Sequence, residues 1–171
     1  MIKIYVDGSA HPNPGPGGYG VFGFDDVTGE VLIIKSQQFE HTTNNAMELT
    51  AILEAFKVFG QQNSYYKNNN VTIYTDSAYS YNTLTKWLFD WQKRGWKKAD
   101  KKVPENLDLI KEYWSYYEMG WRVNFELIPG HSGIEYNELV DKLATGKITL
   151  EEIYNEYRDE TYTLGRITTT D

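Results

Sequence analysis

The sequence predicts an α/β protein with a mixed five-stranded sheet, three antiparallel strands followed by alternating helices and strands, flanked by helices. Segments 2–7, 19–24 and 31–39 have strand patterns and are joined by short links, which favours an antiparallel meander. Beyond them helical and strand patterns alternate, as in chains that build parallel sheets. The 171 residues are 40% hydrophobic and suit one packed domain, and they show no internal repeat or linker.

The first three strands are predicted from alternation and from the turns between them. Ile2, Ile4 and Val6 occupy every second position, which is the period of a half-buried strand. The proline- and glycine-rich segment 11–18 predicts a turn, and segment 25–30 predicts a hairpin between the second and third strands.

A helix and a further strand are predicted next. Apolar residues recur at helical spacing over 47–58, after candidate caps at 43–45, and Gly60 is expected to end this helix. The asparagine-rich stretch 61–70 predicts a loop, and the apolar run 71–75 predicts the fourth strand.

Two more helices and the fifth strand follow. Helical spacing of apolar residues predicts helices over 81–91 and 107–117, which should end near Gly95 and Gly120. Segment 121–127 alternates apolar and polar residues without a break, so it is the clearest strand pattern in the chain.

The end of the chain predicts one core helix and an extension. The last core helix is expected over 139–143, so that residues 1–146 form the main domain. In the C-terminal extension, 147–171, Thr149 and Glu152 fit a capping box, and an irregular tail follows. The helix between them carries an apolar stripe, which implies docking against this core or against a second copy: Leu150, Ile153, Tyr154 and Tyr157.

Composition excludes several classes of protein. The sequence has no cysteine, so disulfides and thiolate metal sites are excluded. The apolar run 1–6 is too short for a signal peptide, and no stretch is long enough to span a membrane. We therefore expect a protein that is not bound to a membrane and acts in the cytoplasm.

Charge is distributed unevenly along the chain. The net charge is −7, yet segment 86–102 carries +5 and the rest of the chain −12. A local basic patch can contact phosphates in spite of an acidic whole, although many such runs are only solvated surface.

Four carboxylates stand where predicted elements begin or end. Asp7 lies on the first strand and Asp76 at the end of the fourth, while Glu48 is expected in the first turn of the first helix and Asp141 lies on the last core helix. Ligands of open α/β sheets bind at the carboxyl ends of strands. Carboxylates that converge repel one another unless they share protons or cations, and hard oxygen ligands suit Mg²⁺ or Mn²⁺. Any one of them can instead be a solvated surface group.

Four motifs around these acids resemble those of type 1 ribonuclease H. They are Asp7-Gly8-Ser9 with 13–20, the stretch 42–49 around Glu48, Thr75-Asp76-Ser77, and 130–133 followed by Asn137-Glu138 and Asp141. The resemblance runs from about Lys3 to Gly146 and implies a ribonuclease H-like fold, with 1–146 as the catalytic domain. Four motifs in the same order are far more specific than any single one.

The resemblance implies an activity and a set of catalytic residues. The activity is endonucleolytic hydrolysis of the RNA strand of an RNA–DNA hybrid, which leaves 5′-phosphate and 3′-hydroxyl ends. Asp7, Glu48, Asp76 and Asp141 would hold two Mg²⁺ ions, with Mn²⁺ as a substitute. His131 resembles the family's mobile histidine, which assists proton transfer or product release, although a lone loop histidine can also only cap a turn. The protein is expected to act as a monomer without an obligatory protein partner.

The same resemblance implies residues that hold the substrate. By similarity Asn13, Asn44 and Asn45 line the minor groove on the RNA strand, although the last two can instead cap a helix. Amides suit this role because they both donate and accept hydrogen bonds. Thr43 and Asn106 match positions that grip a DNA phosphate. The tryptophan-rich basic segment resembles the family's basic protrusion, although Trp91 also falls on an apolar stripe; its predicted substrate residues are Trp87, Trp91, Lys93, Arg94, Lys97 and Lys98.

Two departures and three alternatives accompany this interpretation. His41 stands where the family often has arginine, and Ala78 where a polar residue is common, so one phosphate contact and one groove contact are in doubt. The alternatives are a transposase-like DNA nuclease of the same fold, a noncatalytic hybrid-binding module and a proofreading exonuclease. The intact carboxylates count against the binding module, and Asp7-Gly8-Ser9 lacks the acidic pair expected of the exonuclease.

Overall fold

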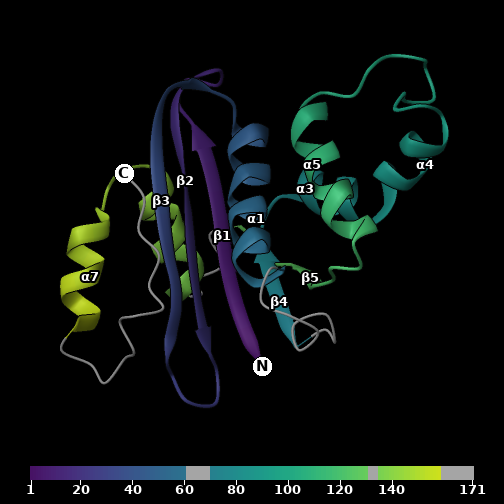
Figure 1. Ribbon diagram of the computed structural model, residues 1–171. Coiled ribbons are helices and arrows are strands. Elements are labelled where there is room, and N and C mark those ends of the chain that lie inside the picture. The colour runs from purple at the N-terminus through teal and green to yellow at the C-terminus, as the bar shows by residue number, and fades with distance from the viewer. Residues whose placement is uncertain (61–69, 131–134, 159–171) are drawn as a thin grey trace.

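Five strands form one mixed sheet in a computed structural model that describes residues 1–60, 70–130 and 135–158 (Figure 1). The spatial order is β3-β2-β1-β4-β5. β1 pairs antiparallel with β2, and β2 with β3, whereas β1 and β4, like β4 and β5, run parallel. The predicted fold class is confirmed. The strands are β1 (Ile2–Ala10), β2 (Gly15–Asp25), β3 (Val31–Thr42), β4 (Val71–Thr75) and β5 (Asn124–Leu127).

Helices follow the strands in the predicted order. The helix predicted over 81–91 begins earlier, at Ala78, and contains a π-helical segment. The predicted loop over 61–69 and the irregular tail predicted from Thr161 lie outside the described residues. Among the described helices, none is long and apolar enough to cross a bilayer. The helices are α1 (Asn44–Gly60), α3 (Ala78–Asn82), the π-helical η1 (Thr83–Trp87), α4 (Leu88–Lys93), α5 (Leu107–Glu118), α6 (Glu135–Ala144) and α7 (Leu150–Arg158).

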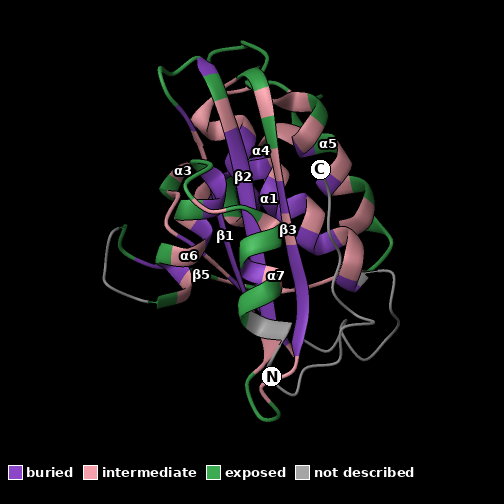
Figure 2. Cartoon of the chain, turned by 90° about the vertical axis from the view of Figure 1, so that its left-hand side faces the viewer, coloured by how far each residue is buried: buried purple, intermediate pink, exposed green. Residues whose placement is uncertain are grey.

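Two hydrophobic cores lie on the two faces of the sheet. The larger one joins the sheet to α1 and α5, and the smaller one joins it to α6 and α7. Figure 2 shows the buried residues concentrated along β1, β2 and β3. β1 is central and buried on both faces: Ile4 and Val6 pack in the larger core, and Tyr5 in the smaller one. The expectation that this strand is only half-buried was therefore wrong, because Tyr5 also faces a core.

The fifth strand is shorter than its sequence pattern predicts. β5 begins at Asn124, whereas Trp121 still belongs to the end of α5. Gly120 has a φ of 87°, and the Trp121 amide donates to the carbonyl of Tyr116 at 3.2 Å. This is a Schellman ending, in which a hydrophobic contact accompanies the hydrogen bond. The rings of Trp121 and Tyr116 stack with centroids 4.6 Å apart, so the alternation begins in a helix cap and not in a strand.

The extension docks against this chain's own core. Thr149 Oγ1 accepts from the amide of Glu152 at 3.2 Å, as the predicted capping box requires. Ile153 is fully buried and packs in the smaller core with Val31 and Ile34 of β3. The apolar stripe predicted docking either against this core or against a second copy, and α7 docks against this core.

Candidate active site

Three of the predicted carboxylates converge at one edge of the sheet. Asp7 comes from β1, Glu48 from α1 and Asp76 from the residue after β4, and each offers an oxygen within 4.8 Å of the others. Asp7 and Glu48 are each only 6% exposed, while Asp76 is half-buried. The sequence predicted Glu48 in the first turn of this helix. This was wrong, because α1 begins at Asn44 and Glu48 therefore lies beyond the first turn.

The local backbone explains why Asp7 and Glu48 meet. A Cβ placed on Gly8 would lie 2.3 Å from the amide nitrogen of Glu48 and from the carbonyl carbon of Met47. Only glycine allows β1 to approach the start of α1 so closely. The Gly8 amide also donates to Asp7 Oδ1 at 2.9 Å, which fixes that carboxylate.

The turn around Asp76 is fixed on both sides. β1 and β4 are parallel neighbours, so their carboxyl ends reach the same edge of the sheet. Thr75 is fully buried, and its Oγ1 accepts from the Ser77 amide at 3.1 Å. Ser77 then caps α3, because its Oγ accepts from the Ser80 amide. Asp76 is therefore held between a strand end and a capped helix.

Burial and mutual repulsion make the cluster electrostatically costly. Burial raises the pKa of Asp7 to about 7, although a hydrogen bond with Glu48 lowers it, and the charges of Asp76 and Asp141 raise it further. Burial, followed by the charge of Asp7, also raises the pKa of Glu48 well above its usual range. Glu48 Oε2 is buried and has no hydrogen-bond partner among the described residues. A buried oxygen without a partner, in a set of hard donors, fits a divalent cation.

The other two predicted catalytic residues, Asp141 and His131, are not among the three carboxylates that converge. Asp141 is a half-buried residue of α6, which packs closely on β2 because a Cβ on Gly20 would lie 2.7 Å from the Val140 carbonyl oxygen. His131 lies outside the described residues. The residue before it, Gly130, is close to the cluster, since a Cβ there would lie 3.4 Å from Asp76 Oδ2.

We expect the stability of the metal-free protein to fall as the pH rises. The pKa of Asp7 is 3.8 in the unfolded chain and about 7 in the folded one, so between these values the folded protein keeps a proton that the unfolded chain has released. The folded pKa is raised, so the stabilisation is present at low pH and is lost as the pH approaches about 7. Thermal unfolding across this range should show a falling Tm.

Added Mg²⁺ should reverse this fall. Since a cation binds the deprotonated carboxylates, Mg²⁺ should raise Tm more at about pH 8 than at about pH 5. Asp7→Asn should weaken the pH dependence, whereas Asp90→Asn, at an exposed position on α4, should leave it unchanged. An Mg²⁺ effect of equal size at both pH values would contradict this account of the cluster.

Two of the asparagine side chains predicted to face RNA are held by hydrogen bonds to backbone amides. Asn44 Oδ1 accepts from the Ala10 amide at 2.6 Å, and Asn13 Oδ1 accepts from the Asn44 amide at 3.1 Å. Each amide oxygen therefore already accepts one hydrogen bond within the protein, which fixes the orientation of its side chain. Thr43, and neither asparagine, caps α1, because its Oγ1 accepts from the Ala46 amide at 3.1 Å.

The predicted basic residues lie on α4 and the loop after it. Figure 1 shows α4 at the side of the molecule farthest from β3. Trp87 is 42% exposed and its ring lies 6.1 Å from that of Trp91, which packs partly against the larger core. The packing role considered for Trp91 is confirmed, and its contact with substrate stays a prediction. The basic side chains are exposed except that of Lys98, which is half-buried: Lys93, Arg94, Lys97 and Lys98.

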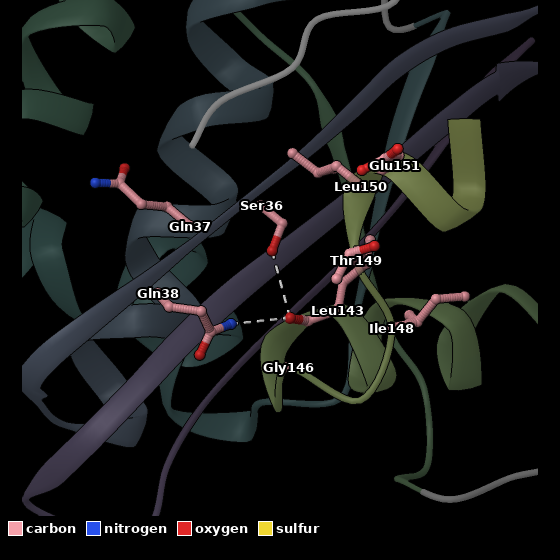
Figure 3. A pocket seen from close by; sticks show the side chains of 9 residues that line it. All are labelled: Ser36, Gln37, Gln38, Leu143, Gly146, Ile148, Thr149, Leu150 and Glu151. Carbon is pink, nitrogen blue, oxygen red and sulfur yellow. Dashed lines mark hydrogen bonds between the residues drawn. The ribbon is translucent and has the colours of Figure 1, made fainter. Parts of the chain in front are cut away.

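A pocket of about 400 Å³ lies elsewhere, between β3, the end of α6 and the start of α7 (Figure 3). Ser36 Oγ and Gln38 Nε2 both donate to the carbonyl of Leu143, at 3.3 and 3.1 Å. Its polar side chains thus tie the end of α6 to β3. None of the predicted site residues lines this pocket.

Three residues that help to build the site were not predicted from the sequence: Gly8, Gly20 and Tyr79. Gly8 and Gly20 lie inside strands, where glycine often marks a close backbone approach, and this signal could have identified them. Tyr79 is different: its hydroxyl accepts from Asn106 Nδ2 at 3.2 Å, a contact between segments far apart in the sequence. No local pattern predicts that contact.

Comparison with known proteins gives one consistent family. The RNase H family model matches residues 1–149. Ribonuclease H of Pseudoalteromonas atlantica is 42% identical over 147 residues, which cover 84% of this chain and 87% of the relative. Ribonuclease HI of Haemophilus ducreyi is 37% identical, covering 89% and 95%.

Solved structures give the same result. LC9-RNase H1, described as a type 1 RNase H, is 27% identical with a TM-score of 0.69, covering 99% of this chain and 86% of its own. LC11-RNase H1, solved in complex with an RNA/DNA hybrid, is 27% identical with a TM-score of 0.59, covering 84% and 94%.

Proposed function

The chain belongs to the RNase H family and is a type 1 ribonuclease H, and from this premise we propose how it cuts the RNA strand of RNA–DNA hybrids. The convergence of Asp7, Glu48 and Asp76 carries the proposal, because buried acids with raised pKa values need a cation to stay charged at neutral pH.

The proposed metal ligands are Asp7, Glu48, Asp76 and Asp141. The unpartnered Glu48 Oε2 and the all-oxygen donor set support Mg²⁺, with Mn²⁺ as a substitute. When bound, two such ions would supply a water made nucleophilic at neutral pH and charge stabilisation for the leaving oxygen.

The reaction we propose is attack of water on the phosphorus and breakage of its bond to the 3′ oxygen. That oxygen takes up a proton and becomes a 3′-hydroxyl, and the phosphate stays on the 5′ side of the next nucleotide. His131 is the residue we propose to move a proton or assist product release, and the closeness of Gly130 to Asp76 supports this. Asp76 would hold its metal ion at a fixed place beside the phosphate, because the end of β4 and the capped helix α3 fix the position of Asp76.

The asparagines would contact the RNA strand mainly through their N–H groups. Since Asn13 and Asn44 use their oxygens within the protein, their N–H groups would meet acceptors in the minor groove, with Asn45 beside them. Purine N3 and pyrimidine O2 are acceptors that every base pair presents there, and the 2′-hydroxyl also accepts.

The DNA strand would be held by phosphate contacts. Thr43 and Asn106 are the residues we propose for one phosphate, and the exposed basic side chains after Trp87 for others. His41 at the end of β3 and Ala78 at the start of α3 are exposed, so the weaker contacts expected of them stay predictions. We further propose a monomer that acts in the cytoplasm, with 1–146 as catalytic domain and 147–171 as extension.

A substrate panel tests the proposed function. Labelled RNA–DNA hybrid, double-stranded RNA, single-stranded RNA and duplex DNA are each incubated with Mg²⁺ and with a chelator. We expect cutting of the hybrid's RNA strand only, with 5′-phosphate ends, and none in chelator, because the carboxylate cluster needs a cation. Equal cutting of duplex DNA would favour the DNA nuclease, and binding without cutting would favour the binding module.

A further inference from the structure

Asn106 occupies the cap position of α5 without capping it. Asparagine at this position usually accepts from the first amides of the helix. Here the residue has φ 57° and ψ 32°, and its side chain makes no cap hydrogen bond. Its Nδ2 instead donates to the hydroxyl oxygen of Tyr79, 3.2 Å away.

Tyr79 is well placed to hold this amide. It lies on α3, shortly after Asp76, and its half-buried ring packs against the larger core. Burial raises the pKa of Tyr79, so its hydroxyl is neutral at physiological pH and can both donate and accept. The hydroxyl also lies 3.5 Å from the carbonyl oxygen of Glu105, to which it donates.

The start of α3 is in turn fixed relative to the carboxylate cluster. Ser77 caps α3 and its amide is held by Thr75 Oγ1, so the helix continues rigidly from the strand end that carries Asp76. Hydrogen bonds therefore connect the end of β4 to α3, and Tyr79 on α3 to Asn106.

We propose that Tyr79 is a positioning residue, whose hydroxyl orients the Asn106 amide toward a phosphate of the DNA strand. This inference rests on the proposed function, in which Asn106 contacts that phosphate. The two N–H bonds of an amide lie in one plane, so anchoring one of them on Tyr79 fixes the direction of the other. The anchored amide then meets the phosphate without first losing rotational freedom.

Removing one hydroxyl separates this role from packing. Tyr79→Phe keeps the ring and its packing but leaves the Asn106 amide without its acceptor. We expect KM for hybrid to rise roughly threefold to tenfold, as for the loss of one hydrogen bond, with kcat within about twofold. Tyr81→Phe on the same helix removes a hydroxyl that has no part in this contact and should change neither constant. Unchanged KM in Tyr79→Phe, or a fall in kcat alone, would overturn the proposal.

A second experiment locates the phosphate. Hybrids carry one neutral methylphosphonate linkage, moved stepwise along the DNA strand, and KM is measured for each. In the wild-type chain, one linkage should show a rise in KM that becomes smaller in Tyr79→Phe and in Asn106→Ala. Linkages contacted by the basic side chains should keep their full effect on KM in both variants. The double variant should show no further loss, because the two residues act on one contact.

The outcomes separate this inference from the function on which it rests. If the wild-type chain cuts hybrid but every linkage keeps its full sensitivity in Tyr79→Phe, the positioning role is overturned and the proposed function stands. The same holds if no DNA linkage is sensitive in the wild-type chain. If hybrid is not cut at all, the proposed function fails and this inference with it.

Discussion

Replacing Asp76 with asparagine should abolish hybrid cleavage while the protein stays folded. Asparagine has the same shape but removes one charge from a cluster whose oxygens lie within 4.8 Å of one another. A metal site contributes several kcal/mol to catalysis and each 1.36 kcal/mol is tenfold in rate, so kcat should fall roughly a thousandfold or more. Single-turnover cleavage of labelled hybrid measures this loss.

The fold of this variant should be at least as stable as that of the wild type without metal. The charge of Asp76 contributes to the raised pKa of Asp7 and of Glu48, so its removal relieves repulsion. The metal-free Tm should therefore not fall. Glu151→Gln, at an exposed position on α7, is the control and should keep full activity. Activity above about a tenth of wild type in Asp76→Asn would rule out the proposed role of Asp76.

Gly8→Ala should cause the largest loss of stability. The new Cβ would lie 2.3 Å from two backbone atoms of α1, and backbone on both sides cannot turn aside as a side chain does. We expect a cost of roughly 3 kcal/mol or more, which for a domain of this size lowers Tm by about 10 °C. The folded fraction should also be poorly active, because relief of the clash moves Glu48 away from Asp7. Thermal unfolding and cleavage by the folded protein measure the two effects.

A second glycine provides the matched control. A Cβ on Gly120 would meet nothing within 4 Å, so Gly120→Ala costs only what its φ of 87° imposes. That cost is about 1–2 kcal/mol. It should leave kcat unchanged, because Gly120 precedes β5, whose start pairs with Thr72 at the end of β4 away from Asp76. A smaller destabilisation by Gly8→Ala than by Gly120→Ala would contradict the close approach of β1 and α1.

Most of the fold could be predicted because local patterns and tertiary packing agree. The strands around Ile4 and the helix that starts behind Thr43 follow from periodicity and a cap. Two details depended on what lies nearby in space. The alternation predicted that Tyr5 faces solvent, but α6 covers that face of the sheet. The alternation also predicted that Trp121 belongs to a strand, but its ring stacks on that of Tyr116 at the end of α5.

The candidate site was predictable in its residue types but not in its electrostatics. Motifs identified Asp7, Glu48 and Asp76, since their order and neighbours are specific. Their burial, which raises the pKa of Asp7 to about 7, depends on packing between segments far apart in the sequence. The direction of the Asn44 amide is likewise set by the Ala10 amide, and no pattern in the sequence indicates it.

Helix α7 has a consequence for the edge of the sheet. β3 is an outermost strand, and the fully buried Ile153 covers Val31 and Ile34 upon it. An apolar face of an outermost strand that is left exposed favours association with another chain. Helix α7 covers this apolar face, and we expect its removal to promote self-association.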